Sequence, residues 1–179
     1  MIAIKNATVI TDGRYMRSNV YMEDGVICAV TKEDLFAEQV IDAENGFVAP
    51  GLIDIHTHGA GGCDFLDGTV QAYLTAARVH AMHGATSIVP TLTSVNTERI
   101  RAAMPVFDAA KKQNHTGANL LGLHLEGPYF SLSQKGAQEE RFIRPFDQDE
   151  YETILNDAEG RIVPAYPASI ARLVRLPNL

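Results

Sequence analysis

The apolar and polar positions of the first 47 residues alternate in short runs, and this alternation favours β-strands over helices. The dipeptides Asp12-Gly13 and Asp24-Gly25 interrupt the runs, and an Asp-Gly pair suits the tight turn of a hairpin. Residues 19–23 and 26–30 flank the second turn, as the two strands of a hairpin would. The pattern therefore predicts a small antiparallel β module over residues 1–47.

From residue 48 onward, the apolar segments become longer. Leu52-Ile53-Asp54-Ile55 is a nearly continuous apolar run, which is typical of a parallel strand buried on both faces. Similar runs at residues 87–92 and 119–125 predict two further strands.

Apolar residues at helical spacing lie between these strands. They predict a helix over residues 69–83 and a second helix that begins after Asn96, a good N-cap, while residues 147–150 open a third. Strands that alternate with helices indicate a parallel sheet or barrel. We therefore predict an α/β fold in which residues 48–160 form a partial TIM-like barrel of about three βα units. Residues 161–179 carry three prolines and no clean period, and are expected to be an irregular tail.

The composition is that of an ordinary globular protein, with 46% hydrophobic and 21% charged residues among 179. The net charge is −7 and no basic cluster offsets it, which argues against nucleic acid and anionic membranes as partners. The sequence contains no run of 18 apolar residues, so it does not predict a membrane span. Cys28 and Cys63 are too few for a disulfide framework, so we expect free thiols and a cytoplasmic location.

His56 and His58 stand two residues apart at the end of the first apolar run. Side chains two apart on a strand point to the same side, so the two imidazoles converge. In barrel enzymes the carboxyl ends of the strands carry the active site. The spacing predicts two ligands of one metal ion; the alternative is a pair of polar residues that bind no ion.

Glu126 closes the third predicted strand, directly before Gly127-Pro128. Its carboxylate faces the same edge of the sheet, and zinc accepts imidazole and carboxylate ligands together. We therefore interpret Glu126 as a third metal ligand rather than a surface residue. His124 lies on the same side of the strand and is interpreted as an interior residue rather than a ligand.

The remaining histidines carry weaker signals. His80 and His83 lie three apart near the end of the first predicted helix, where we expect them to be solvated or to cap the helix. His115 falls in a polar loop and is expected at the surface.

Several blocks of the sequence resemble a known family. Residues 50–59, Pro-Gly-Leu-Ile-Asp-Ile-His-Thr-His-Gly, resemble the opening signature of the amidohydrolase superfamily. Within that superfamily, residues 122–128 and 134–137 resemble the N-acetylglucosamine-6-phosphate deacetylases, and residues 59–65 and 84–91 fit the same family.

The resemblance implies a distorted TIM barrel with a small β-sandwich. It implies hydrolysis of the N-acetyl group of N-acetylglucosamine 6-phosphate, an amino-sugar phosphate, to glucosamine 6-phosphate and acetate in amino-sugar catabolism. It also implies a divalent metal ion, with zinc expected, and a homo-oligomer. Two alternatives stay open: another amidohydrolase of the dihydroorotase-like or deaminase-like kind, and a non-catalytic fragment.

The resemblance also implies roles for single residues. The family's metal-binding glutamate maps onto Glu126, and its paired histidines map onto His56 and His58. A substrate-binding block maps onto Ala137 and Gln138, where Gln138 stands in place of the usual histidine. The family's other metal-binding histidines and its catalytic aspartate have no counterpart, and the catalytic residue stays unassigned. We therefore expect a truncated amino-terminal part that is weakly active or inactive alone and prone to self-association or aggregation.

Overall fold

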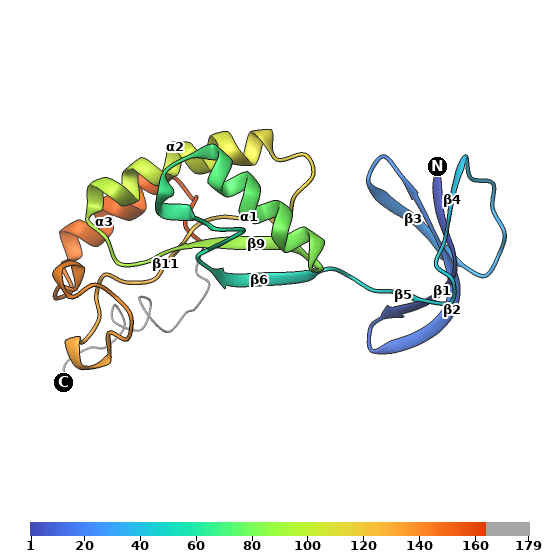
Figure 1. Ribbon diagram of the computed structural model, residues 1–179, viewed down its shortest axis with the longest axis horizontal. Coiled ribbons are helices and arrows are strands. Elements are labelled where there is room, and N and C mark those ends of the chain that lie inside the picture. Colours follow the sequence, from blue (N-terminus) through green and yellow to red (C-terminus); the bar gives the residue numbers. More distant parts are fainter. Residues whose placement is uncertain (164–179) are drawn as a thin grey trace. The chain divides into compact units, whose positions relative to one another are not determined.

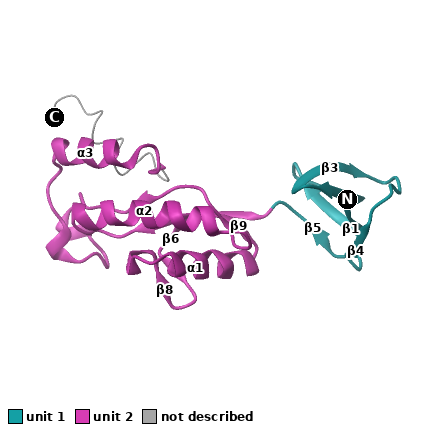
Figure 2. Cartoon of the chain, turned by 90° about the horizontal axis from the view of Figure 1, so that it is seen from above, with its two compact units in different colours: residues 1–50 teal, residues 51–179 magenta. Residues whose placement is uncertain are grey.

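The computed structural model describes residues 1–163. It divides into two compact units, Met1–Pro50 and the part from Gly51 onward, which are coloured separately in Figure 2. Most of the predicted tail, residues 164–179, lies outside the described residues.

The first unit is a single mixed sheet with the strand order β3-β2-β1-β4, in which β5 also pairs with β1. Its first three strands form two hairpins, and the backbone turns through positive φ at Asp12-Gly13 and Asp24-Gly25, as predicted. Ala7, Val9 and Val20 form its small core. The strands are β1 (Ile2–Thr11), β2 (Arg14–Glu23), β3 (Val26–Thr31), β4 (Gln39–Asp42) and β5 (Phe47–Val48).

The prediction of a purely antiparallel module is wrong, because β4 and β5 both pair with β1 in parallel. Residues 32–38 return the chain to the other side of β1, where the amide of Glu38 donates to the carbonyl of Met1 at 3.1 Å. Turn residues in the sequence predict hairpins. The partner of a strand that follows a crossover connection depends instead on residues far away in the chain. The parallel pairing therefore left no local signal.

The second unit is an open parallel sheet covered by helices, and the described residues form no closed barrel. Strand β9 is central, with β6 on one side and β10 and β11 on the other. Figure 1 shows α1 and α2 over one side of β6 and β9. The predicted alternation of strands and helices is confirmed. The strands are β6 (Leu52–Thr57), β7 (Gly59–Ala60), β8 (Cys63–Asp64), β9 (Ala85–Leu92), β10 (Asn119–Leu120) and β11 (His124–Leu125).

Each of the long helices begins at a polar side chain that accepts from an otherwise unpaired amide. Thr69 accepts from Ala72, while Asn96 and Asp147 do the same for α2 and α3. The apolar face of α2 packs into the main core. No helix among residues 1–163 combines the length and the apolarity that a membrane crossing requires. The helices are α1 (Val70–Met82), α2 (Thr97–Gln113) and α3 (Gln148–Ala158), with the short turns η1 (Phe65–Asp67), η2 (Leu132–Gln134) and η3 (Glu140–Phe142).

Strand β6 is parallel to β9, as predicted, but it is not buried on both faces. Leu52, Ile53 and Ile55 are 69%, 61% and 41% exposed. Within the described residues β6 has a partner strand on one side only. An apolar run predicts the strand, whereas its burial depends on neighbours supplied by the tertiary structure.

Residues 161–163 continue the parallel order, although the sequence predicts an irregular tail from Arg161. Ile162 forms a parallel bridge with Leu123, and the amide of Leu123 donates to the carbonyl of Arg161 at 2.8 Å. The Arg161 guanidinium also binds both carboxylate oxygens of Asp108 on α2. A three-residue segment has no period to read, so only these long-range contacts reveal it.

Candidate metal centre

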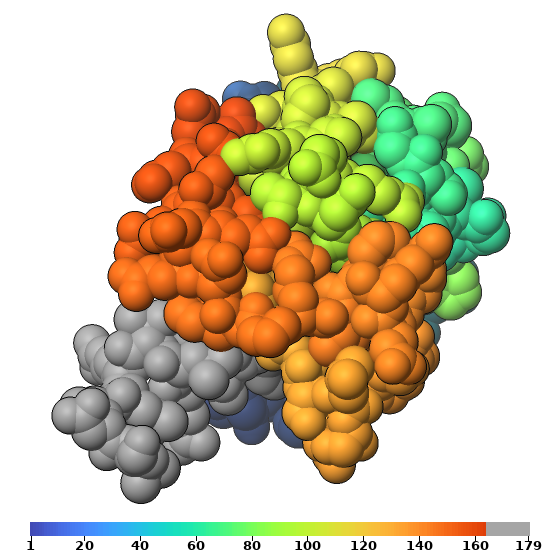
Figure 3. Space-filling view, turned by 90° about the vertical axis from the view of Figure 1, so that its left-hand side faces the viewer, coloured from blue at the N-terminus to red at the C-terminus, as the bar shows by residue number. Residues whose placement is uncertain are grey.

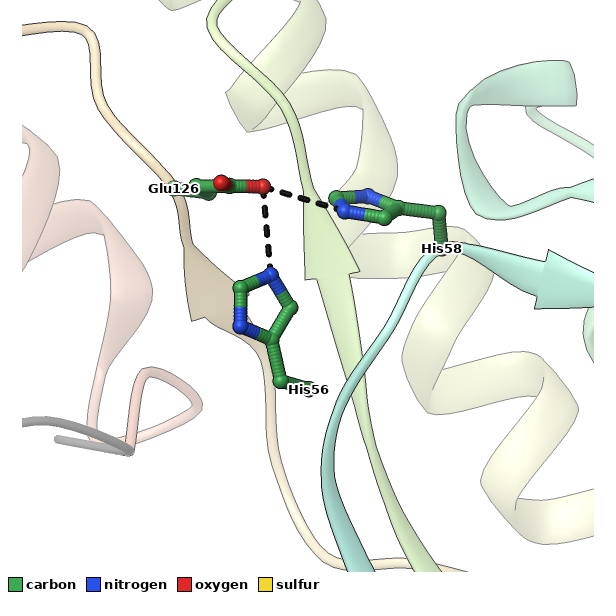
Figure 4. A group of neighbouring side chains, drawn as sticks. All are labelled: His56, His58 and Glu126. Carbon is green, nitrogen blue, oxygen red and sulfur yellow. Dashed lines mark hydrogen bonds and ion pairs between the residues drawn. The ribbon is translucent and has the colours of Figure 1, made fainter. Parts of the chain in front are cut away.

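The side chains of His56, His58 and Glu126 meet at the carboxyl edge of the sheet, as Figure 4 shows. Nε2 of His56 lies 3.2 Å, and Nε2 of His58 3.0 Å, from the same Oε2 atom of Glu126. His56 belongs to β6, His58 follows it directly, and Glu126 follows β11. Both strands pair with β9, so the parallel sheet brings together side chains 70 residues apart in the sequence.

The register of β6 with β9 shifts between Asp54 and Thr57, the stretch that contains His56. Hydrogen bonds to side chains take the place of regular strand pairing there. The amide of His56 donates to Oδ1 of Asp54 at 3.0 Å, and the amide of Thr57 donates to Oγ1 of Thr91 at 3.2 Å. These bonds satisfy backbone donors that the irregular ladder leaves unpaired, and they define the backbone that carries both imidazoles.

Glu126 is fixed through its backbone. Its amide donates to the carbonyl of Leu92 at 2.9 Å, and its carbonyl accepts from the hydroxyl of Ser94 at 3.2 Å. Glycine is required at the next position, because Gly127 has φ 102° and a Cβ there would lie 2.1 Å from the Ser94 hydroxyl oxygen. The carboxylate therefore projects from a backbone tied to the end of β9.

The three side chains fit a zinc ion. In a tetrahedral site with metal–ligand bonds of about 2.0–2.2 Å, neighbouring ligand atoms lie roughly 3.3 Å apart. The observed nitrogen–oxygen distances of 3.2 and 3.0 Å are close to this spacing, and all three ligand atoms lie within 4.8 Å of one another. The side chains of His56, His58 and Glu126 are 35%, 40% and 26% exposed, which leaves water access to a fourth position.

His124 is buried beside this centre, as expected for an interior residue. Its Nδ1 lies 3.2 Å from Oγ1 of Thr91, and its ring centroid lies 5.0 Å from that of His56. Burial, and then the neighbouring His56, lower the pKa of His124. The shift favours a neutral imidazole next to the ligand set.

His80 is not the solvated or capping residue that the sequence suggests. Its side chain is only 17% exposed, and its Nε2 lies 3.0 Å from Oγ1 of Thr57. His83 does cap α1, through Nδ1 at 2.8 Å from the carbonyl of Val79, and His115 is exposed as predicted. The available signal was helical periodicity, because His80 follows the buried Ala76 and Ala77 by four and three residues.

The two residues predicted to contact substrate differ in environment. Ala137 is exposed, whereas Gln138 is buried. Oε1 of Gln138 accepts from the amide of Ser94 at 2.7 Å, so the side chain is joined to the residue that binds the Glu126 backbone. A contact between Gln138 and a sugar hydroxyl stays a prediction, and it would use the amide nitrogen of this side chain.

An ion pair that the sequence did not indicate fixes the segment containing these residues to the helices. Nε and Nη2 of Arg144 donate to the two carboxylate oxygens of Glu150 at 2.9 and 2.6 Å. Glu150 also accepts from the hydroxyls of Tyr129 and Thr97. Figure 3 shows the orange surface of this segment beside the yellow-green start of α2. The hydrogen bond from Arg144 is the main cause that lowers the pKa of Glu150 to about 2.

Replacing Glu150 with glutamine is expected to destabilise the chain by about 3 kcal/mol at pH 7, because the carboxyl loses its charge-assisted bonds. The folded-state pKa is depressed, so the stabilisation is complete above the unfolded value near 4.5 and is lost as the pH falls towards 2. The free energies of unfolding of wild type and Glu150→Gln, measured with urea, should therefore become equal as the pH falls towards 2. Glu152→Gln, on the exposed side of α3, is the control; a gap between wild type and Glu150→Gln that does not depend on pH would contradict the prediction.

Comparisons with known proteins give the chain a context. The model of the amidohydrolase family matches residues 39–112. The chain is 36% identical over 114 residues to the N-acetylglucosamine-6-phosphate deacetylase of Vibrio furnissii, covering 64% of this chain and 29% of that protein. It is 31% identical over 163 residues to the human enzyme of the same name, covering 87% and 39%.

The fold is similar to that of a solved structure of the same kind. The crystal structure of N-acetylglucosamine-6-phosphate deacetylase from Pasteurella multocida matches with a TM-score of 0.81 and 28% identity, covering 90% of this chain and 43% of that one. The chain thus spans less than half the length of each of these three relatives.

Proposed function

We propose that this chain, which belongs to the family of the N-acetylglucosamine-6-phosphate deacetylases, provides the metal-binding strand ends of such a hydrolase. The observation that carries the proposal is the convergence of His56 and His58 on one oxygen of Glu126. The reaction would be the hydrolysis of N-acetylglucosamine 6-phosphate to glucosamine 6-phosphate and acetate.

The donor set supports zinc, because two imidazole nitrogens and one carboxylate oxygen are the ligand types of a catalytic zinc site. A divalent cation held there would polarise the amide carbonyl and lower the pKa of a bound water. His56 and His58 would bind the cation through Nε2, and Glu126 would supply the negative charge that partly neutralises it. The three side chains are partly exposed, so water can reach an ion bound to them.

The neighbouring loop supports a sugar phosphate as the substrate. Ala137 and Gln138 are the predicted substrate contacts, and Gln138 is joined through Ser94 to the backbone of Glu126. Its side-chain amide nitrogen is a donor suited to a sugar hydroxyl or a phosphate oxygen. Ala137 is exposed and offers only its backbone groups to a ligand.

Substrate specificity is tested by incubating the zinc-loaded chain with N-acetylglucosamine 6-phosphate and following acetate release by NMR. We expect slow release, because no general base is assigned among residues 1–163, and we expect Glu126→Gln to lose it. Release at a rate typical of efficient enzymes would contradict the expected weak activity. Hydrolysis of a cyclic amide such as dihydroorotate in place of the sugar phosphate would favour another amidohydrolase activity. No hydrolysis of either substrate, together with no zinc binding, would favour a non-catalytic fragment.

A further inference from the structure

We propose that His80 is a positioning residue for the metal centre: it anchors Thr57 from α1 and lies beside Asp54, so that the imidazoles of His56 and His58 converge. The inference rests on the proposed metal-binding function. His80 is not a member of the group of ligand atoms that meet at Glu126, so its effect would be exerted through the β6 backbone.

The hydrogen-bond roles around Thr57 give the contact a direction. A hydroxyl has one hydrogen to donate, and Oγ1 of Thr57 has the carbonyl of Gly59 at 3.2 Å as its acceptor. The same oxygen therefore accepts from Nε2–H of His80 at 3.0 Å. His80 thus donates the hydrogen bond that the Thr57 hydroxyl oxygen accepts.

A second contact reaches the other side of His56. Nδ1 of His80 lies 3.7 Å from Oδ2 of Asp54, and Oδ1 of Asp54 accepts from the amide of His56 at 3.0 Å. The His80 ring therefore lies beside two residues of β6, Asp54 before His56 and Thr57 after it. The register between β6 and β9 shifts over this interval, so regular pairing alone does not define the backbone there.

His58 depends most on this arrangement. A metal-binding histidine usually donates its second ring nitrogen to a protein group, which orients the ring. Nδ1 of His58 is buried and has no hydrogen-bond partner among residues 1–163. Apart from the contacts of its ring with Glu126 and His56, the orientation of His58 therefore depends on the backbone around it, and Thr57 is the residue directly before it.

Helix α1 is a rigid support for such a contact. Ala76 and Ala77, on the face of α1 that carries His80, are fully buried in the main core. A side chain on a packed helix keeps its geometry better than one on a loop. The tie from His80 to Thr57 therefore links the metal-binding strand to the core.

The test compares zinc dissociation constants, measured by titration calorimetry, in four variants of the chain. His80→Leu removes both nitrogens, and we expect an affinity roughly tenfold or more weaker, as for other residues that orient metal ligands. His80→Gln places its amide nitrogen near the position of Nε2 and should stay within about threefold of wild type. Thr57→Val removes the acceptor and should resemble His80→Leu. His83→Gln, at the C-cap of the same helix with its ring bonded to the carbonyl of Val79, should bind like wild type.

A second readout separates positioning from a general loss of stability. Bound Co²⁺ reports ligand geometry through its visible absorption, so the spectrum should change in His80→Leu and return towards wild type in His80→Gln. Wild-type affinity and spectrum in both His80→Leu and Thr57→Val would overturn the inference while the metal site stands. A wild-type chain that binds no zinc would overturn the metal site and this inference with it. If His80→Leu does not fold, the comparison of Thr57→Val with His83→Gln decides.

Discussion

Replacing Glu126 with glutamine is expected to weaken zinc binding by more than about a hundredfold, beyond the loss typical of residues that only orient ligands. The carboxylate is the one anionic member of the three, and both imidazole nitrogens lie within 3.2 Å of its Oε2 atom. A neutral amide at the same place removes the charge that compensates the cation. Calorimetric titration with zinc measures the change, and the apo variant should keep the fold because the side chain is partly exposed.

The exposed Glu152 on α3 offers a matched control, since Glu152→Gln removes the same charge from the same chain. His58→Ala should lower the affinity strongly as well. Unchanged zinc binding in Glu126→Gln would show that the ion binds elsewhere and would refute the proposed ligand set.

Replacing Gly59 with alanine is expected to cost about 3 kcal/mol of stability and to lower zinc affinity at the same time. Gly59 has φ 153°, and a Cβ there would lie 2.0 Å from the backbone carbonyl oxygen of Cys63. Backbone cannot rotate aside as a side chain can, so the β7–β8 hairpin would shift. The carbonyl of His58 accepts from the amide of Phe65 at 3.0 Å, so the shift would reach the ligand.

Gly62 in the same hairpin separates this clash from the strain of positive φ alone. It has φ 79°, and a Cβ added to it would meet no atom within 4 Å, so Gly62→Ala should cost only about 1 kcal/mol and leave zinc binding intact. Urea unfolding and zinc titration of both variants give the comparison. Equal losses of stability and affinity in the two variants would contradict the steric explanation.

Local features of the sequence predicted most of the elements, because they depend on residues close together in the chain. Asn96 and Asp147 begin their helices as N-caps, and the two Asp-Gly turns form the expected hairpins. The motifs around His56 and Glu126 also indicated the relatives, and the comparisons confirm that resemblance.

Contacts between distant residues account for what the sequence did not predict. The parallel pairing of β4 with β1, the exposure of Ile53 and the bridge at Ile162 each depend on which strands become neighbours. The ion pair of Arg144 with Glu150 likewise joins a loop to a helix, and no sequence pattern predicts it.

The sequence by itself determined which residues could bind a metal, because alternation on a strand directs His56 and His58 to one side whatever surrounds them. It also placed Glu126 at the end of a strand. Only the tertiary structure decided that Glu126 lies between the two imidazoles, since parallel pairing with β9 brings both strand ends to one edge. It alone placed His80 against Thr57, because that contact depends on how α1 packs against the neighbouring strand β9.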